Sequence, residues 1–106
     1  MPRSRSYQTE LVEALKNPDE AAEYLDAALE DGDTQVFLLA LRNVAEAHGG
    51  MGRLSEEAHL NRESLYRMLS GRGNPRLKSL DALLHAMGLR LTVAVVSPGQ
   101  AEAQEG

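Results

Sequence analysis

The chain has 106 residues, no cysteine, 42% hydrophobic residues and a formal net charge of −5 at pH 7. This length suits one domain with a single hydrophobic core, and the lack of cysteine excludes disulfides and cysteine-based zinc sites. The first residues lack the apolar run of a signal peptide, and no stretch approaches the roughly 20 apolar residues of a membrane span, so we expect a soluble cytoplasmic protein with no membrane partner.

The first half of the chain is expected to form three helices. Residues 1–16 form an arm followed by a short helix over 8–16. Asn17 and Pro18 suit the cap and first position of a second helix, which ends at Gly32. Asp33 opens a third helix that runs to about His48, before two glycines. The residues predicted to line the buried sides of the second and third helices are Ala21, Ala22, Leu25, Ala28, Leu29, Phe37, Ala40, Leu41, Val44 and Ala45.

Residues 54–71 have the spacing of two short helices joined by a tight turn. Ser55 is a small residue where the two helices would cross, and His59 falls at the turn. Asn61 suits the cap of the second helix, and Leu65 and Met68 provide inward anchors three residues apart. This pattern predicts a helix-turn-helix. Its second helix presents an outward set made up of Arg62, Glu63, Tyr66 and Arg67.

The last part of the chain is expected to form one more helix and a strand. After a loop over 71–75, a helix begins at Pro75 or Arg76 and ends at Gly88, with a buried side made up of Leu77, Leu80, Leu83, Leu84 and Met87. Residues 89–96 alternate between apolar and other side chains, which predicts a β-strand. It has no second strand to pair with, so we expect it to pair with the same strand of a second copy or with another protein; the alternative is an extended arm on its own helices.

The predicted fold class is therefore mostly α, with five to six helices and a C-terminal strand that pairs across a dimer. Residues 17–96 make up the helix-turn-helix DNA-binding domain with its strand, and residues 97–106 form a disordered tail.

Charge is distributed unevenly along the sequence. Residues 17–52 hold one basic and eight acidic side chains, a local charge of −7, whereas residues 53–78 hold six basic and three acidic ones, a local charge of +3. The second region suits phosphates and the first suits a basic partner, although the net charge alone would argue against nucleic acid. The outward arginines can donate paired hydrogen bonds to guanine and Glu63 can accept from cytosine; alternatively, the outward set is only a solvated helix face.

Four stretches of the chain, together with the leucine-rich helix that ends at Gly88, carry a family resemblance. The stretches are residues 22–33, 37–47, 62–67 and 73–77. The chain resembles addiction-module antidotes, which are HigA-like antitoxins with an Xre-type helix-turn-helix, over about residues 17–93. The resemblance implies a lambda-repressor-like fold and an autorepressor that binds and silences a small basic toxin of the RelE/ParE type. His59 and Ser55 stand where this motif usually has glycine and alanine.

The same resemblance implies roles for individual residues. Arg62, Glu63 and Arg67 would read base edges of double-stranded DNA. The residues that would hold phosphates are Arg53, Tyr66, Arg72, Asn74 and Arg76. A homodimer would place its recognition helices about 34 Å apart, on an inverted-repeat operator.

We find no pattern that predicts an enzyme, a cofactor or a metal site. None of the three histidines has a second histidine at helical spacing, and the adjacent Glu56 and Glu57 point in different directions on a helix. No nucleophile elbow or phosphate-binding loop is present. Two alternatives to the antitoxin remain: a stand-alone prophage regulator without a toxin partner, and an interaction adaptor that has lost DNA binding.

Overall fold

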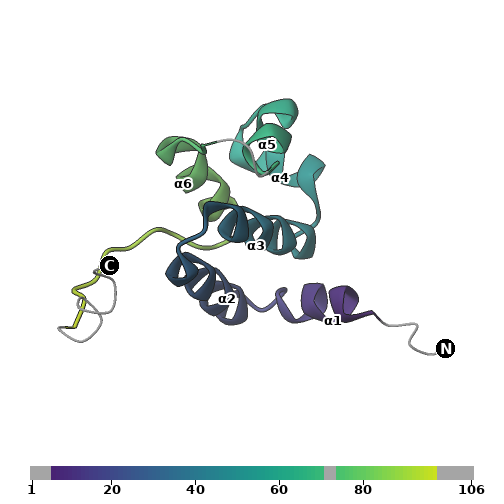
Figure 1. Cartoon of the computed structure of the whole chain (residues 1–106). Helices are drawn as coiled ribbons and strands as arrows, with labels where there is room; N and C mark the ends of the chain where they lie inside the picture. Colours follow the sequence, from purple (N-terminus) through teal and green to yellow (C-terminus); the bar gives the residue numbers. More distant parts are fainter. Residues whose placement is uncertain (1–5, 71–73, 98–106) are drawn as a thin grey trace.

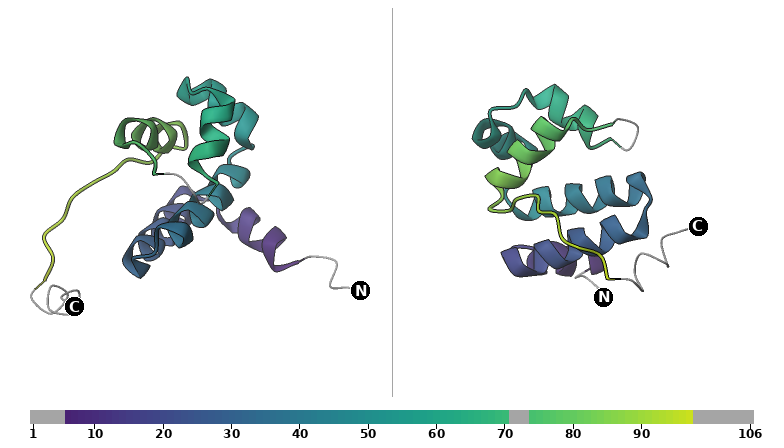
Figure 2. Two further views of the ribbon diagram at one scale, coloured as in Figure 1. Left: turned by 45° about the horizontal axis from the view of Figure 1, so that its top comes forward. Right: turned by 90° about the vertical axis from the view of Figure 1, so that its left-hand side faces the viewer.

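The chain is built around one central helix, Thr34–Ala47 (α3). The computed structural model describes residues 6–70 and 74–97, and these contain six helices. Tyr7–Ala14 (α1) and Pro18–Asp31 (α2) lie on one side of α3, and Met51–Ala58 (α4), Arg62–Met68 (α5) and Leu77–Ala86 (α6) lie on the other. The layers are visible in Figure 1 and in the right-hand view of Figure 2. The expected helices are thus confirmed within the described residues.

The predicted caps of α2 and α3 are present. Asn17 begins α2, and its side-chain oxygen accepts hydrogen bonds from the backbone N–H groups of Asp19 at 2.8 Å and Glu20 at 3.4 Å. Gly32 ends this helix with φ of +83°, a left-handed conformation that glycine adopts without steric cost. Asp33 then caps α3 by accepting from the backbone of Gln35 at 2.9 Å. The two helices are therefore joined by a tight, sequence-encoded turn.

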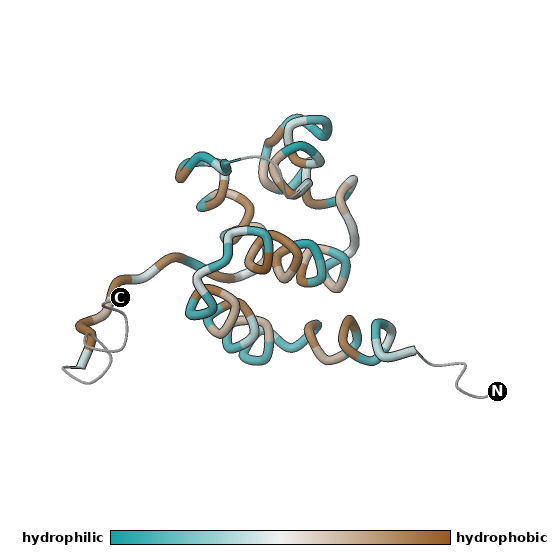
Figure 3. The backbone as a smooth tube through the Cα atoms, viewed as in Figure 1, coloured by the Kyte–Doolittle hydropathy of each residue, from teal (hydrophilic) through white to brown (hydrophobic). Residues whose placement is uncertain are grey.

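Helix α3 contributes buried residues to both layers. Leu38 and Leu41 are fully buried, as are Leu54 of α4, Leu65 of α5 and Leu83 of α6. These side chains belong to one cluster, which also includes residues of α2. Figure 3 shows the corresponding concentration of apolar residues along α3.

Three predicted core positions are wrong. Ala22 and Leu29 of α2 are exposed, Leu29 by 53%, because the buried residues of this helix form a narrow stripe of Ala21, Leu25 and Ala28. Leu77 is 72% exposed because it is the first residue of α6 and precedes the part of that helix that is packed.

A buried polar side chain ties the N-terminal helices to α3. Asn43 is only 8% exposed; its oxygen accepts from Gln8 Nε2 of α1 at 2.9 Å, and its Nδ2 donates to the Tyr24 hydroxyl of α2 at 2.9 Å. Burying a side-chain amide without hydrogen-bond partners would lower the stability of the fold, and here both the oxygen and the nitrogen of Asn43 have a partner. These bonds fix the positions of α1 and α2 relative to α3.

The predicted β-strand over residues 89–96 is absent from the described residues. The last backbone hydrogen bond of the helical body runs from Leu89 N–H to the Leu84 carbonyl at 2.8 Å, and the chain then extends away from the helices (Figures 1 and 3). A strand requires a neighbouring strand, and no other described segment provides one. Val93 and Val95 are consequently 99% and 96% exposed. We refer to residues 89–97 as the C-terminal arm.

None of the helices among residues 6–70 and 74–97 has the length and hydropathy that would be needed to cross a membrane.

Candidate nucleic-acid interface

Helices α4 and α5 are joined by a three-residue turn whose geometry follows the predicted pattern. His59 ends α4 with φ of +57°, and the Leu60 N–H returns to the Ser55 carbonyl at 2.9 Å. Asn61 then caps α5 by accepting from the Ser64 backbone at 3.1 Å. Ser55 is buried, and its hydroxyl donates to the Gly52 carbonyl at 2.8 Å, so the polar group at the predicted crossing point is satisfied.

Helix α5 has a buried side and an exposed side, as predicted. Leu65, Met68 and the C-cap residue Leu69 are buried, whereas all four members of the predicted outward set are exposed. The buried leucine and methionine hold α5 against the rest of the body. Its exposed side carries two arginines, one glutamate and a half-exposed tyrosine.

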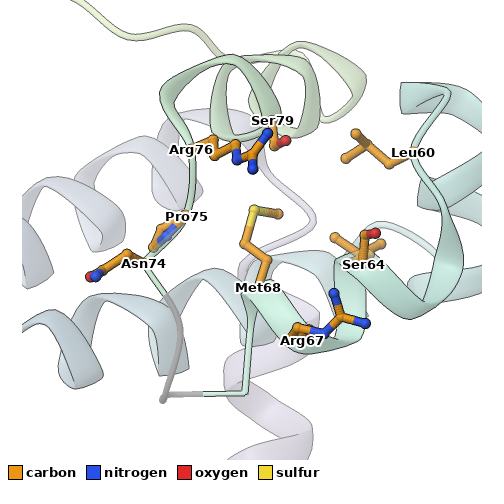
Figure 4. Close-up of a pocket in the computed structure, with 9 residues that line it drawn as sticks. Leu60, Ser64, Arg67, Met68, Asn74, Pro75, Arg76 and Ser79 are labelled. Carbon is orange, nitrogen blue, oxygen red and sulfur yellow. The ribbon is translucent and has the colours of Figure 1, made fainter.

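One flank of α5 borders a groove that separates it from α6. Its volume is about 370 Å³, and Arg67 of α5 and Arg76, which precedes α6, both line it. Figure 4 shows Met68 standing between these two arginines. The residues that line the groove are Leu60, Ser64, Leu65, Arg67, Met68, Asn74, Pro75, Arg76 and Ser79. Because no side chain caps α6, its first N–H groups add to the positive potential, so the groove suits an anionic group.

The opposite flank of α5 borders a second groove of about 450 Å³. Tyr66 lines this groove and is 51% exposed, and Leu39 of α3 is 57% exposed beside it. The other lining residues are Gln8, Arg42, Asn43, Glu46, Gly50 and Met51. Arg67 and Tyr66 therefore border different grooves, and Glu63 lines neither of the two.

One predicted site residue, Arg53, is not brought together with the others. Arg53 of α4 donates from Nε to Glu57 Oε2 at 3.0 Å, and it borders a separate hollow with Lys16 and His48. Arg72 lies outside the described residues. The structure thus gathers Arg67, Asn74 and Arg76 in one groove and places Arg62 and Tyr66 together on the other flank.

Sequence reasoning missed three residues beside this surface. Ser64 and Ser79 provide hydroxyl groups in the first groove, and Gly52 of α4 lies against the Arg62 guanidinium. Ser79 falls one helical turn after Arg76, a spacing that could have indicated its position. The contact of Gly52 depends on the crossing of α4 and α5 and has no local signal.

Acidic side chains are concentrated on α2, in the layer on the far side of α3. All six are exposed, and none forms an ion pair within residues 6–70 and 74–97; they are Asp19, Glu20, Glu23, Asp26, Glu30 and Asp31. No group of three or more histidine, aspartate or glutamate side chains among the described residues could hold a metal ion.

The described residues form a small, mostly helical protein. Helix α2, with six exposed acidic residues, lies on one side of α3, and α5, with two exposed arginines, lies on the other. A model of the family described as "Probable addiction module antidote protein" matches residues 6–95, and this chain belongs to that family. A protein of Haemophilus influenzae named only as uncharacterized is 31% identical over 84 residues, which cover 79% of this chain and 86% of the relative. No solved structure matches the chain significantly.

The left-handed conformation of His59 leads to a stability prediction. His59 is exposed, so a substitution there tests backbone strain with little change in packing. His59→Gly should raise the free energy of unfolding by up to about 1 kcal/mol, whereas the β-branched His59→Val should lower it by about 1–2 kcal/mol. Urea unfolding followed by circular dichroism measures both; equal midpoints for the two variants would contradict the strained turn.

Proposed function

We propose that this protein is a DNA-binding antitoxin that represses its own operon and neutralises a small basic toxin of the RelE/ParE type. The observation that carries the proposal is the exposed basic side of α5, supported from behind by buried Leu65 and Met68 and flanked by the arginine-lined groove. Membership in the antidote family supports the antitoxin part.

For DNA binding, we propose that α4 and α5 act as a helix-turn-helix, with α5 in the major groove. Arg67, Glu63 and Arg62 lie on its exposed side, where they would contact base edges. The proposed phosphate contacts are Arg53, Arg72, Asn74 and Arg76. The ring of Tyr66 instead lies near the Arg62 guanidinium, 6.0 Å from its Cζ to the ring centre. The α5–α6 groove supports a phosphate contact by Arg76, since this residue and the uncapped start of α6 lie beside α5.

Removing Arg67 or Arg76 should weaken DNA binding in different ways. On a duplex taken from directly upstream of the reading frame, Arg67→Ala should lower affinity about tenfold or more and reduce the preference for this duplex over a scrambled one. Arg76→Ala should weaken binding to both duplexes similarly and reduce the salt slope by about one. Fluorescence anisotropy over a series of salt concentrations measures each effect.

Arg90→Ala is the matched control, because Arg90 follows the opposite end of α6 from Arg76 and loses the same charge. If all three variants bind like the wild type, α5 does not read DNA. If the wild type itself does not bind the duplex, the adaptor alternative is favoured.

For toxin binding, we propose that the acidic side of α2 is the docking surface. Its carboxylates are exposed and have no basic partner within the described residues, and this layer is separated from α5 by α3. A small basic protein would supply the missing positive charge and would be steered to this surface.

Charge reversal on α2 tests the docking surface. Asp26→Lys with Glu30→Lys should abolish copurification with the small protein encoded beside this gene while leaving DNA affinity unchanged. The variant should fold, because both side chains are exposed and Glu30→Lys places a lysine in the last turn of α2, where it interacts favourably with the helix dipole. Glu56→Lys with Asp81→Lys carries the same reversals on α4 and α6 and should retain copurification. If no neighbouring small protein copurifies with the wild type, the stand-alone regulator is favoured.

We further propose a homodimer, with the C-terminal arms of two copies packed together. The support is the exposure of Val93 and Val95, since apolar side chains that lie close together in water can mark an interaction surface. A two-fold axis would also match an inverted-repeat operator.

Acidic substitutions in the arm test this dimer. Val93→Asp with Val95→Asp should give a monomer in sedimentation equilibrium with an unchanged circular dichroism spectrum, because neither side chain contacts the helical body appreciably. Thr92→Asp with Ala94→Asp changes the alternate positions and should remain dimeric. A dimer that persists in the valine variant would place the interface elsewhere.

A further inference from the structure

The side chain of Arg62, the first residue of α5, lies near Gly52 and Tyr66. On one side, a β-carbon built on Gly52 of α4 would lie 3.5 Å from Arg62 Nη2 and 3.6 Å from Cζ. Arg62 Cζ also lies 6.0 Å from the centre of the Tyr66 ring, one helical turn along α5 and at the outer limit of a cation–π contact. The guanidinium therefore has neighbours on two helices, the Gly52 backbone of α4 and the Tyr66 ring of α5.

The hydrogen-bonding capacity of Arg62 is unused. Among the described residues, it forms no hydrogen bond and no ion pair, although its side chain is exposed at the start of α5. A guanidinium has five N–H donors in a rigid planar fork. Arg53, by contrast, donates a hydrogen bond from Nε to Glu57. Arg62 thus has a neighbour on each of two helices and keeps its donors available.

An arginine that is restrained before it binds loses less side-chain entropy when a ligand arrives. The start of a recognition helix is also where side chains reach base edges. We infer that Gly52 and Tyr66 are positioning residues that hold the Arg62 fork ready for a pair of acceptor atoms on DNA. This inference rests on the proposed DNA binding, and neither positioning residue needs to touch DNA itself. The acceptor pair is either guanine O6 and N7 or two oxygens of one phosphate, since both fit the fork.

Gly52 is important in this arrangement because of its size. Its φ is not in the left-handed range, so its backbone conformation is open to other residues. A single methyl group would be in ordinary van der Waals contact with the guanidinium, whereas a longer side chain would occupy the space that the guanidinium fills. Gly52→Ala should therefore keep Arg62 in place, and Gly52→Leu should displace it.

Tyr66 would act through its ring rather than through its hydroxyl group. Tyr66→Phe keeps the ring and should bind DNA like the wild type, whereas Tyr66→Leu should lower affinity about two- to fivefold, the value of an exposed cation–π contact. A tyrosine that instead holds a phosphate through its hydroxyl would give equal losses in both variants, and that result would overturn the positioning role.

The main experiment is a double-mutant cycle on Gly52 and Arg62. Affinities of the wild type, Gly52→Ala, Gly52→Leu, Arg62→Ala and the Gly52→Leu/Arg62→Ala double variant are measured by anisotropy on the upstream duplex and on a scrambled duplex. We expect Arg62→Ala and Gly52→Leu each to bind about tenfold more weakly, Gly52→Ala to bind like the wild type, and the double variant to bind no more weakly than Arg62→Ala. Thermal unfolding checks that each variant is folded.

The two duplexes distinguish the two acceptors. A loss confined to the upstream duplex indicates guanine, and a loss on both, with a salt slope lower by about one, indicates a phosphate. Additive losses in the cycle, or wild-type binding by a folded Gly52→Leu, would overturn the inference. Arg67→Ala separates this failure from that of the proposed function, because it should weaken DNA binding whether or not Arg62 is prepositioned.

Discussion

The arrangement of this molecule depends on α3 being buried on more than one side. Half of its residues are buried, and they contact α1 and α2 in one direction and the α4–α6 layer in the other. A helix that is covered on one side only would need a single apolar stripe, whereas α3 carries the wider set that both layers require. Asn43 is the polar exception, and its two hydrogen bonds orient the N-terminal layer. Because α3 separates the layers, the acidic residues of α2 and the arginines of α5 lie on opposite sides and do not neutralise each other. The net charge of −5 therefore conceals an acidic segment over residues 17–52 and a basic segment over residues 53–78.

Much of the helical structure could be predicted because its signals are local. Asn17, Asp33 and Asn61 cap the helices that follow them, and Gly32 ends the one before it, as their residue types indicate. The tight turn at His59 was also predictable, although a histidine there must adopt a left-handed conformation that glycine would accept more readily. Failures occurred where the outcome depends on a distant partner. Residues 89–96 alternate as a strand would, but the pattern alone cannot supply the neighbouring strand that a sheet requires. The exposure of Leu29 depends on how much of α2 is covered by α3.

In the candidate site too, local features could be predicted from the sequence and features that depend on distant residues could not. The outward set on α5 followed from helical spacing, because Leu65 and Met68 determine which side is buried. That Arg67 and Arg76 share a groove, while Tyr66 borders another, depends on the placement of α5 relative to α3 and α6 and could not be predicted from spacing. The ion pair of Arg53 with Glu57 is a local effect that could have been noticed, since the two residues are four apart on one helix. Gly52 and Arg62 are only ten positions apart in the sequence, but they come together only through the turn between α4 and α5, so their proximity could not be predicted from spacing.

The separation of the two surfaces also constrains how the proposed partners could influence each other. A toxin on the acidic side of α2 and a DNA duplex on α5 would lie on opposite sides of α3, so simple steric exclusion by one protomer does not couple them. Coupling would have to pass through α3, where a displacement requires a whole packed layer to move, or through a change in the association of the C-terminal arms. The second route requires less rearrangement, because the arm leaves the helical body at Leu89 and its exposed valines make few contacts with it. Any effect of toxin on repression should therefore depend on the oligomeric state more than on the conformation of α5.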